Sequence, residues 1–287
     1  MIDERIRQAR HEVAITDLEF VKFREFFYKK TGILFGNNKR YFVDKRVSGR
    51  IRETGCKTFR EYFTMMRFQA SGKELQELVN IMTVNETYFF REEHQFKCLS
   101  GPILEEVSHY TSVDQVIRIW SMPSSTGEEP YSIALYLLEH WSKIESRDIE
   151  IIASDIDSAA ISRAKEGVYS ARSVKRLPSK ILNKYFSKVN GDSYKISDDL
   201  RDAINFSKGN LNDPNEMQKF RKFDIIFCRN LLIYFDDTSR KRAAEIFYEA
   251  LNPGGFVLLG HSESMSRISG IFKIRKFPDA IVYQKPR

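Results

Sequence analysis

Residues 116–141 read VIRIWSMPSSTGEEPYSIALYLLEHW, and this stretch decides the fold. The short apolar run at residues 116–120 predicts a strand, and the small, polar residues that follow predict a turn. After the turn, apolar spacing predicts an amphipathic helix with Pro130 near its first position. Small side chains in such a turn let a ligand approach the backbone closely. The stretch therefore predicts a strand-turn-helix unit with a candidate ligand site where the strand ends.

Similar units follow along the chain, because short apolar runs alternate with amphipathic helices from about residue 115 onward. This alternation is typical of a parallel sheet covered by helices, an α/β domain over residues 115–287. The further strands that we expect span residues 149–153, 203–207, 224–228 and 256–259, and the helices lie near residues 130–141, 158–166 and 239–250. Two last strands, at residues 272–275 and 280–284, are joined by so short a link that they predict an antiparallel pair.

A polar stretch at residues 168–202 interrupts the alternation. Within it, Asn190-Gly191 lies between two short runs with the composition of strands, which is where a hairpin turn is expected. We therefore predict a small β subdomain inserted at about residues 168–202.

Residues 1–83 have apolar positions spaced three and four apart, which predicts a run of short helices. Three Thr or Ser starts, at Thr16, Thr58 and Ser71, are each followed three residues later by Glu and match the capping box. Gly32 and Gly55 follow basic residues, as expected where helices end. The sequence thus predicts an all-helical N-terminal domain at residues 1–83, and residues 84–114 are expected to be a linker and active-site segment.

Charge is distributed unevenly along the 287 residues. The net charge is +7, and residues 1–100 supply most of it, because they hold 19 Lys and Arg against 14 Asp and Glu. A basic surface favours nucleic acid, anionic lipid or an acidic protein, and charge alone leaves these three open.

The three cysteines are widely spaced, so we expect reduced, structural cysteines and no metal site. No apolar run approaches the roughly 18 residues of a membrane span, so we expect a cytoplasmic protein.

The residues that follow each predicted strand are the candidates for a ligand site. The turn after the first strand has one glycine and lacks the Gly-x-Gly-x-x-Gly pattern, which disfavours a nicotinamide dinucleotide. Glu128 and Glu129 stand at the start of the next helix. They either attract a cationic ligand, such as the sulfonium and amino groups of S-adenosylmethionine, or only complement the helix dipole.

The other strand ends also carry suitable side chains. Asp155 can accept hydrogen bonds from the two hydroxyls of a ribose, and Asp157 is placed to cap the following helix. The third and fourth strands lead into amide, aliphatic and basic side chains, of which the first two kinds suit an adenine ring: Asn210, Leu211, Arg229 and Asn230. Cys228 ends the apolar run of the fourth strand, where a cysteine behaves as a small hydrophobe rather than as a nucleophile.

Five sets of residues together resemble the CheR-type methyltransferases, which esterify glutamates on chemoreceptors. They are NETYFFRE (85–92), RIWS with STGEEPYS (118–121 and 125–132), ASDID (153–157), FCRN with IYFD (227–230 and 233–236) and GHSE (260–263). They occur in the family's order, and the resemblance spans residues 16–285. The STGEEPYS block is highly specific, and the others are strong in combination. Residues 122–124 depart from the small residue or Cys that many members have there, which leaves the acidic pair in register.

The resemblance implies a Rossmann-like class I S-adenosylmethionine-dependent methyltransferase sheet with a small β subdomain insertion, preceded by an all-α N-terminal domain. It also implies a protein-glutamate O-methyltransferase that forms methyl esters on the cytoplasmic region of methyl-accepting chemotaxis receptors during sensory adaptation, with S-adenosylhomocysteine as product. Carried over position by position, it places these residues on the cofactor: Asn85, Thr87, Arg91, Glu129, Asp155, Asn210, Leu211, Arg229 and Asn230. It associates Arg91 and Tyr234 with catalysis on the substrate side.

The implied reaction needs little acid–base catalysis. A glutamate side chain, with a reference pKa of about 4.3, is already an ionised nucleophile at neutral pH, so we expect no general base. Alignment and a dry site are what the protein can add to an in-line displacement. Arg91 is suited to hold one carboxylate oxygen while the other faces the methyl group. Tyr234 either orients the same group with its hydroxyl or is simply packed after Leu231.

Under this resemblance the basic front domain also has a role, since receptor helices are acidic where their glutamates are unmodified. Lys39, Arg46 and Arg50 are spaced seven and four apart on a helix expected at residues 39–53, so they fall along one stripe. The stripe either docks a receptor helix or is a solvated face. We expect a monomer, with neither a nucleic-acid partner nor a membrane span.

Two other functions are compatible with parts of this pattern. A nucleic-acid methyltransferase would share the cofactor fold and the positive charge, but it needs a pocket for an extruded base, and the segment after the fourth strand lacks a Pro-Pro-aromatic signature. A cofactor-binding interaction protein without catalysis is the second alternative, which the presence of Arg91, Glu129 and Asp155 disfavours.

Overall fold

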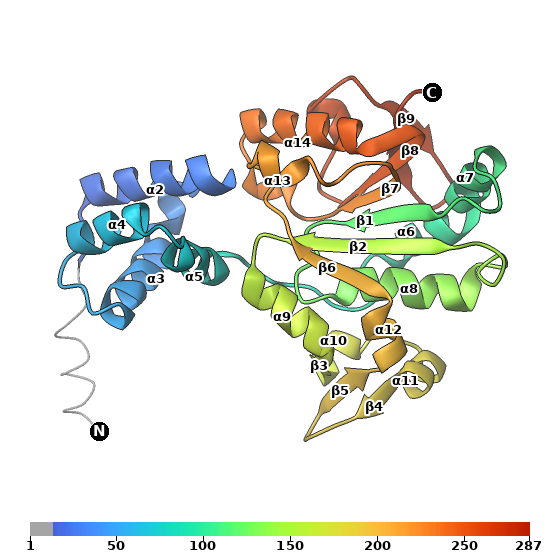
Figure 1. Ribbon diagram of the computed structural model, residues 1–287, viewed down its shortest axis with the longest axis horizontal. Helices are drawn as coiled ribbons and strands as arrows, with labels where there is room; N and C mark the ends of the chain where they lie inside the picture. The colour runs from blue at the N-terminus through green and yellow to red at the C-terminus, as the bar shows by residue number, and fades with distance from the viewer. Residues whose placement is uncertain (1–13) are drawn as a thin grey trace. The chain divides into compact units, whose positions relative to one another are not determined.

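The computed structural model describes residues 14–287. The chain divides into two units between Val84 and Asn85. Helices alone make up the described part of the first unit apart from its turns and an isolated bridge residue, and the second unit holds both sheets of the molecule (Figure 1). The predicted fold class, an all-α N-terminal domain followed by a Rossmann-like α/β sheet with a small inserted sheet, is confirmed.

The helices of the first unit, within its described residues, are α2 (Asp17–Thr31), the 3-10 helix η1 (Asn37–Lys39), α3 (Arg40–Glu53), α4 (Phe59–Phe68) and α5 (Lys73–Met82). Their inward side chains are aromatic and aliphatic, and include Phe23, Phe27, Val47, Tyr62 and Leu78. Burial of each such side chain contributes on the order of 1.5–3 kcal/mol, so the helices are held by their apolar faces.

Two of the three predicted helix starts are confirmed. Thr16 accepts a hydrogen bond from the backbone N–H of Glu19, and the Glu19 carboxylate accepts one from the backbone of Thr16, so both halves of the capping box form. Thr58 caps α4 by accepting from the backbone of Glu61. There the glutamate carboxylate reaches one residue further and accepts from Lys57.

The start predicted at Ser71 is wrong, because Gly72 occupies the N-cap position of α5. The Glu74 carboxylate is needed elsewhere: it accepts from Arg50 at 2.9 and 2.7 Å and from the Tyr62 hydroxyl at 2.9 Å. Glu74 is only 5% exposed, and a buried carboxylate requires such partners. These hydrogen bonds join α3, α4 and α5.

The stripe predicted on α3 is not an exposed face. Arg46 donates to a backbone carbonyl of α5 at 2.6 Å, and Arg50 pairs with the buried carboxylate of that same helix. Lys39 precedes α3 and is exposed, whereas the exposed cations on α3 itself are Lys45 and Arg52. Helical spacing placed Arg46 and Arg50 on one side of α3, but it could not show that this side packs against α5.

The second unit is built on a seven-stranded sheet with the order β6-β2-β1-β7-β8-β10-β9. Its strands are β1 (Ile117–Ser121), β2 (Ile149–Asp155), β6 (Ile204–Lys208), β7 (Phe223–Cys228), β8 (Leu251–Leu259), β9 (Lys273–Lys276) and β10 (Ile281–Gln284). The first five of these strands in chain order are mutually parallel, and β10 runs antiparallel to both of its neighbours, as predicted for the last two strands. Strand order reverses beside β1, which is where ligands bind in open α/β sheets.

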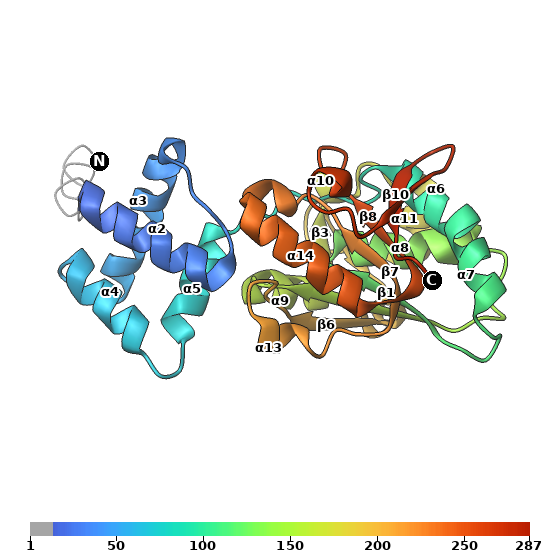
Figure 2. The same ribbon diagram turned by 90° about the horizontal axis from the view of Figure 1, so that it is seen from above.

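Helices cover both faces of this sheet. α8 (Glu128–His140) and α9 (Ser158–Glu166) lie on one face, and α13 (Pro214–Met217) and α14 (Asp237–Ala250) lie on the other (Figure 1). Figure 2 shows α14 from above, lying over the strands. Ile119 belongs to the buried cluster that includes α8, whereas the next residue, Trp120, contacts Phe247 of α14. Successive side chains of β1 thus fill opposite layers, as a central parallel strand requires.

Residues 84–114 do more than link the two predicted domains. They contain α6 (Glu93–Cys98), the π-helical turn η2 (Leu99–Ile103) and α7 (Leu104–Tyr110). Phe89, Phe96, Leu99 and Val107 are fully buried in the core of the second unit. From Asn85 onward the segment is therefore an integral part of that core.

A three-stranded antiparallel sheet lies within residues 168–202, in the order β3 (Val168–Ser170), β5 (Ser193–Ile196) and β4 (Phe186–Lys188). The hairpin predicted at Asn190-Gly191 joins β4 to β5, with Gly191 at φ 64°. Short helices flank the strands: α10 (Ala171–Val174), α11 (Ser179–Tyr185) and α12 (Asp198–Asp202). Figure 1 shows this small sheet on the side of the main sheet that α8 and α9 cover.

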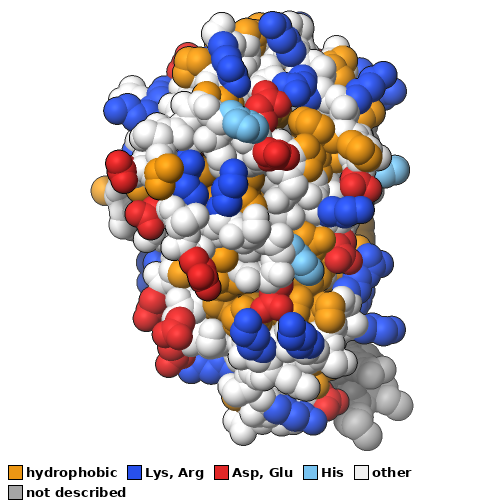
Figure 3. Space-filling view, turned by 90° about the vertical axis from the view of Figure 1, so that its right-hand side faces the viewer, with side chains coloured by type: hydrophobic (Ala, Val, Ile, Leu, Met, Phe, Trp, Pro, Cys, Tyr) orange, Lys and Arg blue, Asp and Glu red, His pale blue; other side chains and the backbone are white. Residues whose placement is uncertain are grey.

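Within residues 14–287, none of the helices is both long enough and apolar enough to cross a bilayer. Figure 3 shows one face of the molecule, on which Lys and Arg side chains are interspersed with Asp and Glu.

Candidate functional site

The candidate site lies where β1, β2, β7 and β8 end, because parallel strands deliver the residues that follow them to one edge of the sheet. The turn after β1 rests on the end of β2, since the Ser124 N–H donates to the Ser154 carbonyl. Gly127, at φ 96°, ends this turn, and a Cβ there would lie 2.9 Å from both the Ala164 side chain and the Tyr169 hydroxyl. The turn therefore requires glycine at this position and keeps its backbone accessible.

Glu129 and Arg229 form a nearly buried ion pair beside this turn. The Glu129 carboxylate accepts from the Ser121 hydroxyl at 2.8 Å and from Arg229 at 3.0 Å. Arg229 also lies 3.3 Å from the Glu92 carboxylate and donates to the Arg91 carbonyl. Burial raises the pKa of Glu129, and the Arg229 guanidinium opposes that rise. Arg229 thus ties the end of β7 to two segments that are distant in sequence.

Glu128 has a different role from its neighbour. Its carboxylate accepts from the Thr126 hydroxyl at 2.6 Å and from the Ser173 hydroxyl at 2.8 Å, and the residue is 4% exposed. Burial raises its pKa, and these two hydroxyl donors oppose the rise. The acidic pair is therefore split: Glu129 faces the strand ends, and Glu128 holds the turn to the inserted subdomain.

Asp155 ends β2 and is 3% exposed. One carboxylate oxygen accepts from the Ser125 N–H at 2.7 Å and the other from the Asp157 N–H at 2.9 Å, and the Ile156 backbone also donates to the group, so part of its acceptor capacity is left. Burial raises the pKa of Asp155 to about 6, although these backbone donors oppose the rise. Asp157 caps α9 through Ala160, as predicted.

Asn85 connects two of these groups. Its amide donates to the Asp157 carboxylate at 2.7 Å and accepts from the Ser125 hydroxyl at 2.7 Å. Thr87 follows in the same segment and is half-buried. The structure thus brings Asn85, a residue placed on the cofactor by resemblance, to the end of the strand that carries Asp155.

Backbone geometry presents the Arg91 side chain. Its neighbours Phe90 and Glu92 both have φ 56°, a left-handed conformation that non-glycine residues adopt rarely and only where surrounding contacts enforce it. Here Phe90 is 2% exposed, and Glu92 is held by Arg229. Among the described residues, the half-buried Arg91 guanidinium donates to the Glu86 carbonyl alone, at 2.7 Å, which leaves other N–H groups for a ligand.

Tyr234 lies close to Arg91 and Glu86, which both influence its ionisation. The residue is 40% exposed at the end of η3 (Leu232–Tyr234). Partial burial raises the pKa of its phenol, and the Glu86 carboxylate raises it further, so the hydroxyl is a hydrogen-bond donor at neutral pH. Of the two roles left open by the sequence, exposure beside Arg91 favours the one in which the hydroxyl faces a substrate.

The residues proposed for the adenine ring, Asn210 and Leu211, lie in the loop after β6. The Asn210 N–H donates to the Glu216 carboxylate at 3.0 Å, and the Asn210 side chain accepts from the Asn212 N–H at 2.9 Å. Leu211 is 4% exposed, so its side chain is largely covered by protein. Cys228, at the end of β7, is fully buried and its thiol pKa is raised well above the ordinary value, as expected for a small hydrophobe.

Sequence reasoning missed the role of Glu263, which follows β8. Its carboxylate accepts from the backbone N–H groups of Asn230, Leu232 and Gly260 at 2.8, 2.7 and 2.8 Å. Asn230 has φ 58°, so Glu263 holds the loop after β7 in a strained conformation. The rule that drew attention to the other strand ends would have found Glu263 if it had been applied to the fifth strand. Glu92 carried no comparable signal.

The donor set fits S-adenosylmethionine, which has a cationic and an anionic end. Glu129 and Asp155 retain acceptor positions for an ammonium group and for ribose hydroxyls. The Arg229 Nε–H is buried without a hydrogen-bond acceptor among the described residues, which leaves a donor for a carboxylate. Within residues 14–287, no cluster of His, Cys, Asp or Glu has the form of a metal site.

Comparison with known proteins matches both units. A family model for the CheR methyltransferase SAM-binding domain matches residues 85–281, and one for the CheR methyltransferase all-alpha domain matches residues 18–83. Chemotaxis protein methyltransferase 2 of Vibrio cholerae is 57% identical over 96% of each chain. Chemotaxis protein methyltransferases of Borreliella burgdorferi and Salmonella typhimurium are 33% and 34% identical, over 88% and 93% of this chain and 90% and 91% of theirs.

Proposed function

Because the chain belongs to the CheR methyltransferase family, and is therefore an S-adenosylmethionine-dependent chemotaxis protein methyltransferase, we propose that it esterifies glutamate side chains of methyl-accepting chemotaxis receptors. It acts in the cytoplasm, on the cytoplasmic region of those receptors, and so takes part in sensory adaptation. We assign the residues proposed from the sequence to the same cofactor and substrate roles. Arg229 joins the two groups, because it donates both to Glu129 and to the Arg91 carbonyl.

One observation carries this proposal: a half-exposed arginine stands beside a half-exposed tyrosine, and both adjoin the acidic cofactor site. Arg91 has N–H donors to spare, and its carbonyl is held by Arg229, the partner of Glu129. A guanidinium binds carboxylates with directional donors, so the pair suits an acidic side chain as acceptor of the methyl group.

S-adenosylmethionine supplies an electrophilic methyl group when it is bound. Glu129 and Asp155 would hold its ammonium and ribose groups, and Arg91 would fix one oxygen of the substrate carboxylate so that the other is free to attack. The Tyr234 hydroxyl donates to the same carboxylate and limits its rotation. Such alignment lowers the barrier by up to about 7–11 kcal/mol in well-oriented systems, and no proton needs to be removed from an ionised carboxylate.

The first unit supplies positive charge for docking. Lys39, Lys45 and Arg52 are exposed, and they offer an acidic receptor helix a basic surface in place of Arg46 and Arg50, which are engaged with α5. Complementary charge mainly speeds association and selects partners, and its effect falls with salt. The protein acts as a monomer in this proposal.

The test is to incubate the protein with labelled S-adenosylmethionine and a purified receptor cytoplasmic fragment. Base-labile label on the fragment, at glutamates identified by mass spectrometry, is the expected result. Label in RNA or DNA instead, or cofactor binding without transfer to any substrate, would reject the proposal in favour of a nucleic-acid methyltransferase or a non-catalytic binding protein. Replacement of the receptor glutamates by glutamine is the matched control, because the amide has no ionised oxygen.

A further inference from the structure

A pocket of about 500 Å³ lies in the second unit, and the residue that precedes Tyr234 is part of its lining. Its walls come from η3, from the first turn of α14, and from the segment after β8 that includes η4 (Met265–Arg267). Ile233 lines the pocket and immediately precedes Tyr234 in the chain. The pocket therefore begins within about 4 Å of backbone from the candidate catalytic tyrosine.

Glu263 fixes the shape of this pocket, because its carboxylate joins two of the walls. Its carboxylate accepts from the backbone of Leu232 on one wall and of Gly260 at the base of the other. These bonds and the one from Asn230 fix the carboxylate between the walls as an anion, and the charged side chains that line the pocket still leave a net charge of +1: Asp237, Glu263, Arg240, Lys241 and Arg267.

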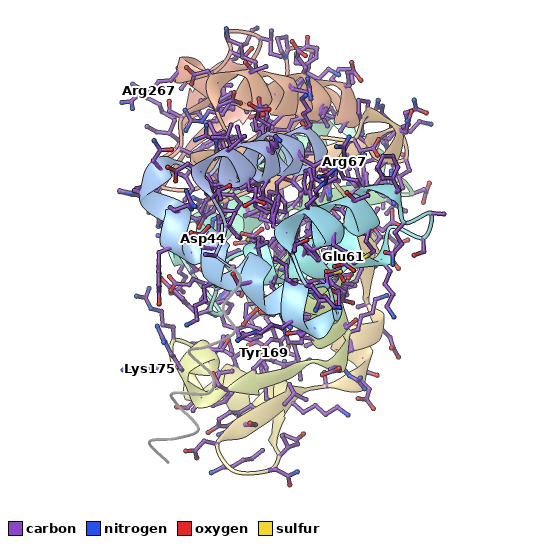
Figure 4. All side chains as sticks on the ribbon, turned by 90° about the vertical axis from the view of Figure 1, so that its left-hand side faces the viewer. Asp44, Glu61, Arg67, Tyr169, Lys175 and Arg267 are labelled. Atoms are coloured by element: carbon purple, nitrogen blue, oxygen red, sulfur yellow. The ribbon has the colours of Figure 1, made fainter. Side chains whose placement is uncertain are left out.

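The remaining charges in the pocket leave an excess of cations. Arg240 donates to the Leu232 carbonyl and pairs with Asp237 at 3.1 Å, so these two opposite charges compensate each other. Lys241 and Arg267 are exposed, and neither side chain forms an ion pair within residues 14–287. Figure 4 shows the labelled Arg267 side chain at the outer edge of the second unit, extending away from the ribbon.

Apolar surface accompanies these cations. Ile233 is 44% exposed, and Ile268 is half-buried on the opposite wall. An acidic side chain on a helix presents the matching combination, an aliphatic stem with a terminal carboxylate. Side chains one turn apart on a helix are separated by about 5–6 Å, so an acidic side chain next to a glutamate that lies beside Tyr234 can reach the pocket lined by the neighbouring Ile233.

We propose that this pocket, through Lys241 and Arg267, binds an acidic side chain of the substrate that lies one helical turn from the glutamate being methylated. The inference rests on the proposed function, and it adds a rule of specificity: the protein selects glutamates that have an acidic neighbour on the same helix face. Methylation of one glutamate then weakens binding for methylation of its neighbour, because the ester no longer carries the charge that the pocket recognises.

The test compares the wild-type protein, the double variant Lys241→Ala/Arg267→Ala, and a control with the same loss of charge, Lys143→Ala/Lys273→Ala. Lys143 precedes β2 and Lys273 begins β9, so both exposed lysines lie at the opposite edge of the sheet. The substrates are a receptor fragment and a matched fragment in which acidic residues one turn from the methylated glutamate are changed to amides. Formation of base-labile methyl esters gives kcat and KM for each pair.

We expect KM for the unmodified fragment to rise about three- to tenfold in Lys241→Ala/Arg267→Ala while kcat stays within about twofold, since exposed charge pairs contribute modestly to binding. The control variant should match the wild type. On the amide fragment, the wild-type KM should rise and the difference between the two proteins should vanish. An unchanged KM in the pocket variant, or a difference that persists on the amide fragment, would overturn the inference. If the wild type forms no methyl esters on either fragment, the proposed function is rejected, and the inference, which rests on it, is rejected as well.

Discussion

The Arg229 guanidinium lies 3.0 Å from the Glu129 carboxylate, and the Arg229 side chain is only 2% exposed. The same guanidinium lies 3.3 Å from Glu92 and donates to the Arg91 carbonyl. A group at the end of β7 therefore holds the acid proposed for the cofactor and the backbone of the arginine proposed for the substrate.

Replacement of Arg229 by leucine should destabilise the fold by about 3–5 kcal/mol, because it leaves the buried Glu129 carboxylate without its cation. The pKa of Glu129, already raised by burial, should rise further, and cofactor affinity at neutral pH should fall. Urea unfolding and calorimetric titration with S-adenosylhomocysteine measure the two effects. Arg221→Leu removes an arginine paired at 2.9 Å with the exposed Glu249 and should cost at most about 1 kcal/mol. Equal losses in the two variants would contradict this account.

Replacement of Arg91 by alanine should abolish methyl transfer, with a loss of at least about 10²–10³ in kcat, because the substrate carboxylate loses its directional partner at the reacting centre. Single-turnover assays with a receptor fragment provide the measurement. Arg176→Ala is a close control, since the guanidinium groups of Arg91 and Arg176 lie 5.7 and 4.6 Å from the centre of the same Tyr88 ring. The control should turn over normally. Near-normal turnover in the Arg91 variant would rule out its proposed role.

Tyr234→Phe should slow transfer by about three- to tenfold and leave stability unchanged, since one hydrogen bond contributes about 0.5–1.5 kcal/mol and the side chain is 40% exposed. Because partial burial raises the phenol pKa, the hydroxyl should remain a donor throughout the neutral range. The rate of the wild type should therefore show no break attributable to Tyr234 below pH 9. A phenylalanine variant as fast as the wild type would mean that the tyrosine serves packing alone.

Cofactor affinity should depend on pH through Asp155, whose pKa burial raises to about 6. The charged carboxylate accepts ribose hydroxyls better than the protonated acid, so affinity should be full above pH 7 and decline as pH falls below 6. At pH 5 the expected loss is about tenfold. Calorimetric titration with S-adenosylhomocysteine between pH 5 and 8 tests this. Asp155→Asn should bind weakly and without that pH dependence; a dependence that survives in this variant would rule out Asp155 as the titrating group.

Receptor binding should weaken when the exposed cations of α3 are removed. Lys45→Ala/Arg52→Ala should raise Kd about three- to tenfold at low salt and flatten the salt dependence, because two exposed charges no longer contribute. Surface plasmon resonance at several salt concentrations gives both quantities. Lys57→Ala/Lys73→Ala removes two exposed lysines from the same unit without touching α3 and should leave binding unchanged. Wild-type binding that does not vary with salt would argue against electrostatic docking.

Much of the fold could be predicted from the sequence, because buried parallel strands are continuous apolar runs. Residues 149–153 were expected as a strand and β2 spans Ile149–Asp155, and the helix expected at residues 158–166 coincides with α9. The three-residue strand β3 has too few residues to show a period, so it was missed. Helices α10, α11 and α12 were missed for the same reason.

The site divides along a similar line. Asp155 and Glu129 were found because a rule of topology places the residues after parallel strands at one edge. The partnership of Arg229 with Glu92 could not be predicted, since it depends on how a segment outside the strands folds against the sheet. Charge on α3 was also misjudged: whether Arg50 faces solvent or Glu74 depends on where α5 packs, which helical spacing does not encode.

The close fit around Gly127 bears on how this enzyme could be re-engineered. Tyr169 belongs to β3 of the inserted sheet, and its hydroxyl donates to the Thr126 carbonyl beside that glycine, while Ser173 of the same insertion holds Glu128. The insertion thus supports the turn that ends at Gly127, so it cannot be exchanged independently of that turn. A chimera that grafts another relative's subdomain would therefore have to keep this tyrosine and serine in register for the turn to hold its conformation.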